Sequence, residues 1–153
     1  MPVITQKFIF RSDLQNNPNI LYLFGDNTQR VGLGGQAKEM RGEPNAVGIA
    51  TKLTPSMDDN AFFHDDTFGD NMVVIVEDFI PAFKHVAMGG TVVVPEDGLG
   101  SGLSDMENRC PRTFEDLNTL IEFLDEGVLT KVPASTITIE MIMEEVLLLD
   151  SVF

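Results

Sequence analysis

Cysteine, tryptophan and long apolar runs are scarce in this sequence. Its 153 residues include one cysteine, no tryptophan and one tyrosine. The single Cys110 excludes an internal disulfide framework and a zinc site built from several cysteines. No apolar run approaches the length of a membrane-spanning helix, and the first residues lack the basic and apolar regions of a secretion signal. We therefore expect a cytoplasmic protein that does not insert into membranes.

Basic residues are scarce as well. Ten Lys and Arg residues stand against 24 Asp and Glu residues, so the formal net charge is −14. A uniformly acidic surface repels phosphate backbones, which excludes an extended nucleic-acid-binding surface. A small phosphate-containing ligand remains compatible with this charge, because backbone N–H groups in a cleft can bind phosphate without a basic surface.

Hydrophobic residues account for 43% of the chain, which excludes a disordered acidic protein. The length and the absence of a linker predict one domain over residues 1–153. Strand and helix patterns alternate along the chain, which is typical of the α/β class. Apolar and β-branched runs predict strands at 3–10, 20–24, 45–50 and 91–95. Helical spacing predicts helices at 35–41, 70–87 and 113–126.

Three further predictions concern helix ends and the tail. Asp70 is a suitable N-cap for the second helix, although Met72–Val76 also has strand character. Thr113 is a suitable N-cap for the third helix, and Gly127 is suited to ending it. The tail mixes strand and helix periods, and it favours a strand at 136–142 followed by a short helical end.

Two glycine-rich loops follow predicted strands. They span Gly32–Gly35 and Gly98–Gly102, and the first leads into a short helix. Glycines let a backbone approach a ligand closely, and the N–H groups at a helix N-terminus attract phosphate. Because strands of an α/β sheet carry ligand loops at their carboxyl ends, the two loops can enclose one ligand. Tight connections with left-handed residues are the alternative for each loop.

Three short motifs resemble those of macro domains, which bind ADP-ribose. They are Gly25-Asp26-Asn27 followed by Gly32–Ala37, Val92–Pro95 followed by Gly98–Gly102, and Ile49-Ala50-Thr51-Lys52. The class that they resemble contains the terminal ADP-ribose glycohydrolase and the bacterial antitoxins that remove ADP-ribose from DNA. The resemblance implies a three-layer α/β/α fold with a mixed sheet. It also implies ADP-ribose or a related nucleotide as the ligand, with no cofactor or metal.

The resemblance further implies catalytic residues. Lys52, at the end of a strand, takes the position of the catalytic lysine of that class. The catalytic aspartate of its Gly-x-Gly-Leu-Asp motif falls on Ser104 here, and Asp105 follows one residue later. Either the loop shifts so that Asp105 is catalytic, or the hydrolytic chemistry is altered or lost. The candidates for ligand binding are Asp26, Asn27, Gly32, Gly34, Gly35, Gln36, Arg41, Gly98, Gly100, Ser101, Gly102 and Leu103.

Several of these residues also have a purely structural explanation. Lys52 is alternatively an ordinary solvated lysine, and Asp105 a turn or helix-entry residue. Asp26 and Asn27 would otherwise form a local Asx turn. Arg41 can reach a phosphate, or it can cap its helix and oppose the nearby glutamate.

The segment 53–70 is acidic and polar, and it is predicted to be a solvated loop. Its carboxylates and His64 lack the regular spacing of a calcium loop, so we expect no metal site there. Phe62 and Phe63 in this segment would either fold over a bound adenine or anchor the loop to the core.

The leading hypothesis is a macro-like domain that binds ADP-ribose and hydrolyses it from a modified macromolecule or a nucleotide metabolite. A non-catalytic binder of ADP-ribose or a related nucleotide signal is the first alternative, motivated by Ser104. An interaction module with an unused cleft is the second, motivated by the apolar and acidic tail. Residues 143–153 would then pack on the core or on a second copy of the chain, giving a homo-oligomer.

Overall fold

The computed structural model describes the backbone of residues 1–152 and the side chains of residues 1–149. In this part the sheet contains four strands: β1 (Val3–Gln6), β2 (Leu21–Asn27), β3 (Ala46–Lys52) and β4 (Val92–Pro95). The α-helices are α1 (Arg11–Asn16), α2 (Ala37–Met40), α3 (Phe68–Ala87), α4 (Met106–Arg109), α5 (Pro111–Glu126) and α6 (Ile139–Val152). Short 3-10 helices are η1 (Asp59–Ala61), η2 (Asp65–Thr67) and η3 (Ala134–Thr136). None of the helices described is long and apolar enough to cross a membrane.

The strands pair in the order β1-β4-β2-β3, and every pairing among the described residues is parallel. The mixed sheet implied by the resemblance is therefore wrong for this part of the chain. The antiparallel contact found there is an isolated bridge between Lys52 and Phe62, outside the strand pairs. Because parallel strands run in one direction, all four reach their carboxyl ends at the same edge of the sheet.

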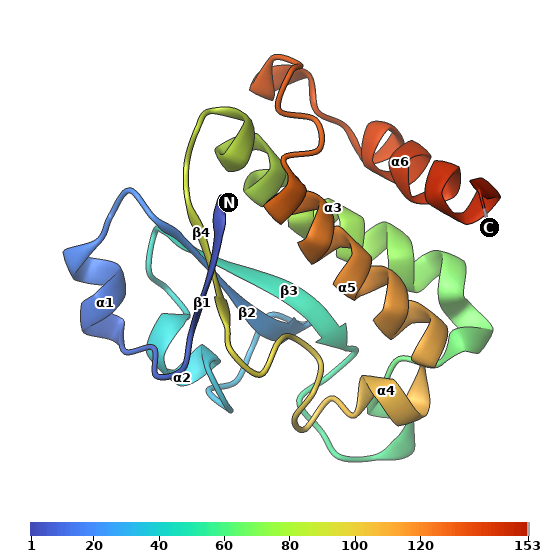
Figure 1. Ribbon diagram of the computed structural model, residues 1–153. Coiled ribbons are helices and arrows are strands. Elements are labelled where there is room, and N and C mark those ends of the chain that lie inside the picture. The colour runs from blue at the N-terminus through green and yellow to red at the C-terminus, as the bar shows by residue number, and fades with distance from the viewer. Residues whose placement is uncertain (153) are drawn as a thin grey trace.

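Helices cover both faces of the sheet and give three layers (Figure 1). α3 and α5 pack on one face, α6 packs against these two helices, and α1 and α2 lie on the other face. Successive side chains of a strand point to opposite faces, so Leu23 and Val94 join the α3 side. Tyr22, Phe24 and Val93 join the α2 side. Burial of both faces explains the uninterrupted apolar runs of β2 and β4.

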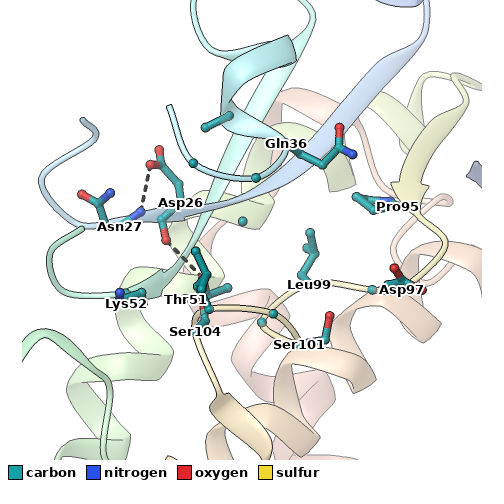
Figure 2. Close-up of a pocket in the computed structure, with 18 of the residues that line it drawn as sticks. Asp26, Asn27, Gln36, Thr51, Lys52, Pro95, Asp97, Leu99, Ser101 and Ser104 are labelled. Carbon is teal, nitrogen blue, oxygen red and sulfur yellow. Dashed lines mark hydrogen bonds between the residues drawn. The ribbon is translucent and has the colours of Figure 1, made fainter. Parts of the chain in front are cut away.

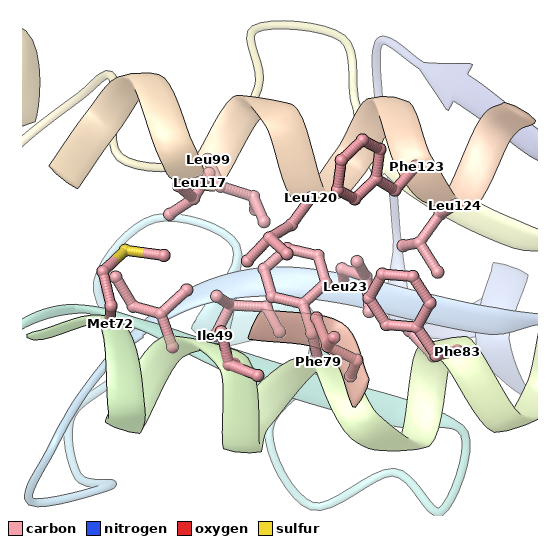
Figure 3. Close-up of a cluster of buried hydrophobic side chains, with 14 of the residues drawn as sticks. Leu23, Ile49, Met72, Phe79, Phe83, Leu99, Leu117, Leu120, Phe123 and Leu124 are labelled. Atoms are coloured by element: carbon pink, nitrogen blue, oxygen red, sulfur yellow. The ribbon is translucent and has the colours of Figure 1, made fainter. Parts of the chain in front are cut away.

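The larger core lies between the sheet and the pair α3 and α5, and residues of α6 extend it beside these helices (Figure 3). Met72, Phe79 and Phe83 are buried on one face of α3, which confirms the helix against the strand alternative. The rings of Phe79 and Phe83 have centroids 6.3 Å apart. Since α3 begins at Phe68, Asp70 lies in its first turn, and the prediction that it caps the helix is wrong.

An ion pair between Arg30 and Asp78 covers the outer edge of β3. Asp78 on α3 accepts a hydrogen bond from the Ala50 N–H at 2.8 Å, and Arg30 donates to the Gly48 carbonyl at 3.4 Å. Arg30 binds both carboxylate oxygens of Asp78, at 2.7 and 2.9 Å. Burial raises the pKa of Asp78 despite these hydrogen bonds. The pair thus occupies backbone groups that a further strand would use, and it ends the sheet at β3.

The first strand is shorter than predicted, and a helix follows it that the apolar pattern does not predict. β1 ends at Gln6, and α1 begins at Arg11. The Asp13 carboxylate accepts hydrogen bonds from the Phe10 N–H at 2.8 Å and from the Gln6 side chain at 3.1 Å. These bonds satisfy groups at the helix start, a contribution that hydrophobic periodicity does not contain.

The tail forms a helix, so the strand predicted at 136–142 is wrong. Helical spacing lets Ile142 and Val146 of α6 enter the core beside α3 and α5. Ile139 and Met143 pack against the same core, whereas strand alternation would have turned them to the side opposite Ile142 and Val146. Leu147 and Leu148 are exposed, whereas the side chains of residues 150–153 lie outside the described part. The homo-oligomer expected from residues 143–153 stays a prediction.

The Asp65 carboxylate caps the N-terminus of α5. It accepts hydrogen bonds from the N–H of Arg112 at 2.9 Å, and from the N–H and hydroxyl of Thr113 at 3.0 and 2.8 Å. Burial opposes ionisation, but these bonds leave the pKa of Asp65 below its usual value. Since α5 begins at Pro111, the prediction that Thr113 is its N-cap is wrong. Gly127 ends the helix in the left-handed conformation, as predicted.

We expect Asp65→Ala to lower the free energy of unfolding by about 1–2 kcal/mol, because the first N–H groups of α5 lose their acceptor. Asp66→Ala removes an exposed carboxylate one residue later and should change it by less than about 0.5 kcal/mol. Urea denaturation followed by circular dichroism measures both values. Equal losses in the two variants would contradict the capping role.

Cys110 is buried where α4 meets α5, and its thiol is shielded from water. Burial, with a smaller contribution from the charge of Asp65, raises the pKa of the thiol from 9.0 to about 12. The unfolded thiol ionises near 9.0, so above that pH the folded state binds more protons than the unfolded state. Its contribution to stability is therefore complete below pH 9.0 and declines as the pH rises toward about 12.

We expect the wild-type protein to lose stability above about pH 9 more steeply than Cys110→Ala, by up to about 1.4 kcal/mol per pH unit. Urea denaturation of both proteins between about pH 8 and about pH 11 measures the difference. The Cys110→Ala protein serves as the reference, because the lysines and the tyrosine titrate in both proteins and only the thiol differs. Parallel pH profiles would rule out a protected thiol.

Candidate functional site

A pocket of about 370 Å³ opens at the edge where the four strands end (Figure 2). Residues that end or follow each strand line it, together with both glycine loops. Its volume lies in the range of small-molecule sites, about 300–1,000 Å³. Ligands bind α/β sheets at this edge because loops from different strands meet there. The pocket is therefore where the glycine loops predict it.

The pocket brings together the residues predicted to bind a ligand. Figure 2 shows the loop of Gln36 and the loop of Ser101 on opposite sides of it. Lys52 also lines the pocket, whereas Asp105 does not. The ligand-binding candidates on its wall are Asp26, Asn27, Gly32, Gly34, Gly35, Gln36, Arg41, Gly98, Gly100, Ser101, Gly102 and Leu103.

Glycines shape the pocket in two ways. Gly98 and Gly100 have φ angles of +82° and +80°, a region that side chains disfavour. A Cβ at Gly100 would also overlap the sulfur of Met106, so a larger residue there would force this buried side chain to shift. A Cβ at Gly34 or Gly102 would meet no heavy atom within 4 Å, so these positions leave space in which a ligand can lie.

The Arg41 guanidinium binds the Asp26 carboxylate at the end of β2. Asp26 is only 8% exposed, and Arg41 donates to its two oxygens at 2.5 and 3.2 Å. Arg41 also donates to the carbonyls of Gly32 at 2.8 Å and Val31 at 3.3 Å. The arginine therefore ties the first glycine loop to the sheet, and it does not pair with Glu43, which binds another arginine.

Asp26 also connects β2 to β3 and to the second glycine loop. A Cβ at Gly48 would lie 2.5 Å from Asp26 Oδ2, so glycine makes room for the carboxylate. The Thr51 hydroxyl donates to the Asp26 carbonyl at 3.2 Å and shares a 2.7 Å hydrogen bond with the Ser104 hydroxyl. Figure 2 shows Thr51 lying between Asp26 and Ser104. The ends of β2 and β3 thus link the two loops.

Asn27 forms the turn that leads from β2 into the first loop. Its side-chain oxygen accepts a hydrogen bond from the Gln29 N–H at 3.0 Å, and its amide nitrogen donates to the Val31 carbonyl at 2.8 Å. This is the Asx-type alternative expected from the sequence. Asn27 nevertheless faces the pocket, so a single residue shapes the loop and contributes to the wall.

Lys52 is buried, with no carboxylate partner among the described residues. The residue is only 7% exposed, and its Nζ donates a hydrogen bond to the Ser56 carbonyl at 2.7 Å. Nζ also lies 4.5 Å from the centroid of the Phe62 ring. Burial lowers the pKa of Lys52, and the positive charge of Arg109 lowers it further. An amine in this setting is a candidate nucleophile or base, and the solvated-lysine alternative is wrong.

Asp105 lies outside the pocket, which corrects its expected place in the site. It precedes α4 with a left-handed backbone, φ +47°. Its carboxylate accepts a hydrogen bond from the Asn108 side chain at 2.8 Å and lies 3.5 Å from the Nε of Arg109. Ser104 lines the pocket instead. The loop does not shift by one residue, because the turn directs Asp105 toward its own helix.

The acidic segment contributes Pro55 to the pocket wall and supports Lys52 from behind. Phe62 and Phe63 are buried, so they anchor the segment to the core, as in one of the two predictions. Arg109 stacks on the Phe62 ring at 3.6 Å, behind Lys52. Within the described residues, no group of three or more His, Cys, Asp or Glu side chains is placed to hold a metal ion.

The pocket is formally neutral although the chain carries −14. Its charged residues are Lys7, Arg41, Lys52, Asp26, Glu96 and Asp97. Lys7, Glu96 and Asp97 were not among the candidates from the sequence. They directly follow β1 and β4, so their positions after two strands were the signal that could have identified them. That signal depends on knowing that these strands are parallel neighbours.

We expect Lys52 to titrate below the ordinary value of 10.5, and Arg109→Gln to raise its pKa, because a neighbouring positive charge is removed. Arg112→Gln is the matched control, since this guanidinium stacks on Phe68 instead. NMR titration of carbon-labelled lysine side chains measures the pKa in each protein. An unchanged or lower pKa in Arg109→Gln would contradict the electrostatic contact.

Comparison with known proteins places the chain in a family. The model of a family of unknown function, DUF7831, matches residues 4–120, which is more than half of the 153 residues. The match includes β2, β3, β4, both glycine loops and Lys52, and it ends within α5. No curated protein and no solved structure matches the sequence or the fold. The chain therefore belongs to DUF7831, a family of unknown function.

Proposed function

We propose that the pocket binds ADP-ribose or a closely related nucleotide, and that Lys52 acts at C1″ of its distal ribose. The observation that carries the proposal is a buried lysine, with no carboxylate partner among the described residues, in a neutral pocket between two glycine loops. The resemblance of the same motifs to macro domains supports the choice of ligand. The strongly acidic remainder of the chain favours a small ligand or a single modified end over a long polyanion.

The glycine loops supply the means of binding a diphosphate. Their backbone N–H groups can approach phosphate oxygens closely where Gly34 and Gly102 leave open space. Arg41 does not need to provide this contact, because its guanidinium is already bound to Asp26. Phosphate recognition would thus come mainly from the backbone, which agrees with a pocket of zero formal charge.

Lys52 provides the reactive group in this proposal. In its neutral form the amine can use its electron pair to form a bond to C1″ while the glycosidic bond from C1″ to the modified group breaks. The leaving group takes the electron pair of that bond and the proton that the attacking nitrogen loses, and water then cleaves the C1″–Nζ bond to release ADP-ribose. In its protonated form the amine would instead stabilise an anionic leaving group. Burial and Arg109 both lower the pKa of Lys52, which increases the neutral fraction. The hydrogen bond to the Ser56 carbonyl and the Phe62 ring hold the amine in place.

A non-catalytic binder is the second candidate, and the position of Asp105 favours it. Macro-domain hydrolases of the class resembled use an aspartate at the Ser104 position, and the Ser104 hydroxyl here binds Thr51. The Asp26 carboxylate is held by Arg41, so it is not free to act as a base toward water. Hydrolysis would then depend on Lys52 without a neighbouring carboxylate.

We expect ADP-ribose to stabilise the wild-type protein by mass action and so to raise its Tm. At a concentration 100 times Kd the free energy of unfolding should rise by about 2.7 kcal/mol. Differential scanning fluorimetry measures the shift, with ribose 5-phosphate as a control that lacks the nucleotide. Absence of a shift at about 1 mM ADP-ribose, in protein with a normal circular dichroism spectrum, would contradict the proposed ligand.

We expect Lys52→Met to lower release of ADP-ribose from a modified substrate at least about 100-fold, because the nucleophile is lost and its apolar stem is kept. Binding of ADP-ribose should change by less than about threefold. Lys38→Met, at an exposed position on α2, is the matched control and should leave both unchanged. Binding without turnover in the wild-type protein would select the non-catalytic candidate.

A further inference from the structure

The polar side chains of the pocket divide into those already bonded within the protein and those that are free. Asp26, Asn27, Arg41, Thr51 and Ser104 all use their side chains in hydrogen bonds to other residues of the protein. These internal bonds fix the orientation of each group and use part of its hydrogen-bonding capacity, which limits what it can offer to a ligand. These residues therefore position the loops more than they read the ligand.

The free polar groups of the pocket are Lys7, Gln36, Glu96, Asp97 and Ser101, of which Glu96 and Asp97 are exposed at its rim. None of their side chains forms a hydrogen bond or an ion pair with another described residue. Figure 2 shows Gln36, Asp97 and Ser101 on the side of the pocket away from Lys52 and Asn27. We call the pair Glu96 and Asp97, which follows β4, the acceptor end of the pocket.

The sheet order separates the acceptor end from Lys52. Lys52 ends β3, which is an edge strand, while β4 is separated from β3 by β2. Two spacings between strands correspond to about 10 Å. A ligand whose distal ribose lies at Lys52 therefore extends across β2 and presents its other end to Glu96 and Asp97.

The chemistry of this end favours hydrogen-bond donors on the ligand. Ionised carboxylates accept hydrogen bonds and cannot donate them. Vicinal ribose hydroxyls are suitable donors, and acidic residues bind ribose hydroxyls in this way in other α/β nucleotide sites. Lys7 also lines this side of the pocket, after β1, but one positive charge does not outweigh two negative charges.

We propose that Glu96 and Asp97 bind the two hydroxyls of the adenosine ribose and so reject a ligand that carries a phosphate on that ribose. The inference rests on the proposed function, because the orientation of the ligand follows from placing C1″ at Lys52. The site would accept nucleotides derived from NAD and exclude those derived from NADP. The physical reason is repulsion between the added phosphate and two carboxylates, together with the loss of one hydroxyl donor.

The test compares ADP-ribose with 2′-phospho-ADP-ribose by isothermal titration calorimetry. The wild-type protein should bind the phosphorylated compound at least about tenfold more weakly. In the double variant Glu96→Gln/Asp97→Asn this ratio should fall to about threefold or less, because amides of the same shape carry no charge. Glu122→Gln, at an exposed position on α5, is the matched control and should keep the wild-type ratio.

The outcomes separate the two proposals. Failure of ADP-ribose itself to bind would overturn the proposed function and this inference with it. Equal binding of the two compounds by the wild-type protein would overturn the inference alone. Tighter binding of 2′-phospho-ADP-ribose that is lost in Lys7→Gln would also overturn it, since Lys7 would then dominate this end. The inference would also be overturned if the double variant kept the wild-type ratio of the two affinities.

Discussion

The buried carboxylate of Asp26 is the point through which the parts of the site are joined. It binds Arg41, which in turn fixes the carbonyls of the first glycine loop. The backbone carbonyl of Asp26 accepts a hydrogen bond from the Thr51 hydroxyl. This hydroxyl is also bonded to Ser104, which follows the second loop. Gly48 on β3 leaves the space that the carboxylate needs. An unpaired carboxylate at 8% exposure would be costly, so Arg41 and the loop that it holds depend on one another.

The all-parallel sheet determines which residues meet at the pocket. Because its strands end at one edge, segments distant in sequence contribute to a single wall. That wall is formally neutral in a chain of charge −14. The surrounding acidic surface disfavours long polyanions, whereas the glycine backbone and Lys52 offer local contacts to a small one. Under the proposed function, the charge of the surface would limit the size of the ligand, and the loops would determine which shape fits.

Lys52 shows how burial can prepare a group for chemistry. Its neighbours are a carbonyl, an aromatic ring and, beyond the ring, Arg109. None of these neutralises the ammonium, so desolvation lowers the pKa without a compensating carboxylate. The acidic segment supplies these contacts through Phe62 and Ser56, which gives a function to a stretch that the sequence indicates only as solvated loop.

The resemblance of its motif to macro domains predicted Lys52 as a site residue, whereas local patterns in the sequence determined the α/β class and the two glycine loops at strand ends. These follow from periodicity and glycine spacing, which act over a few neighbouring residues. Only the tertiary structure decided that the sheet is parallel, that Arg41 binds Asp26, and that Asp105 turns away from the pocket. Each of these depends on a backbone torsion or on a partner many residues away. The spacing of residues along the chain carries no information about either.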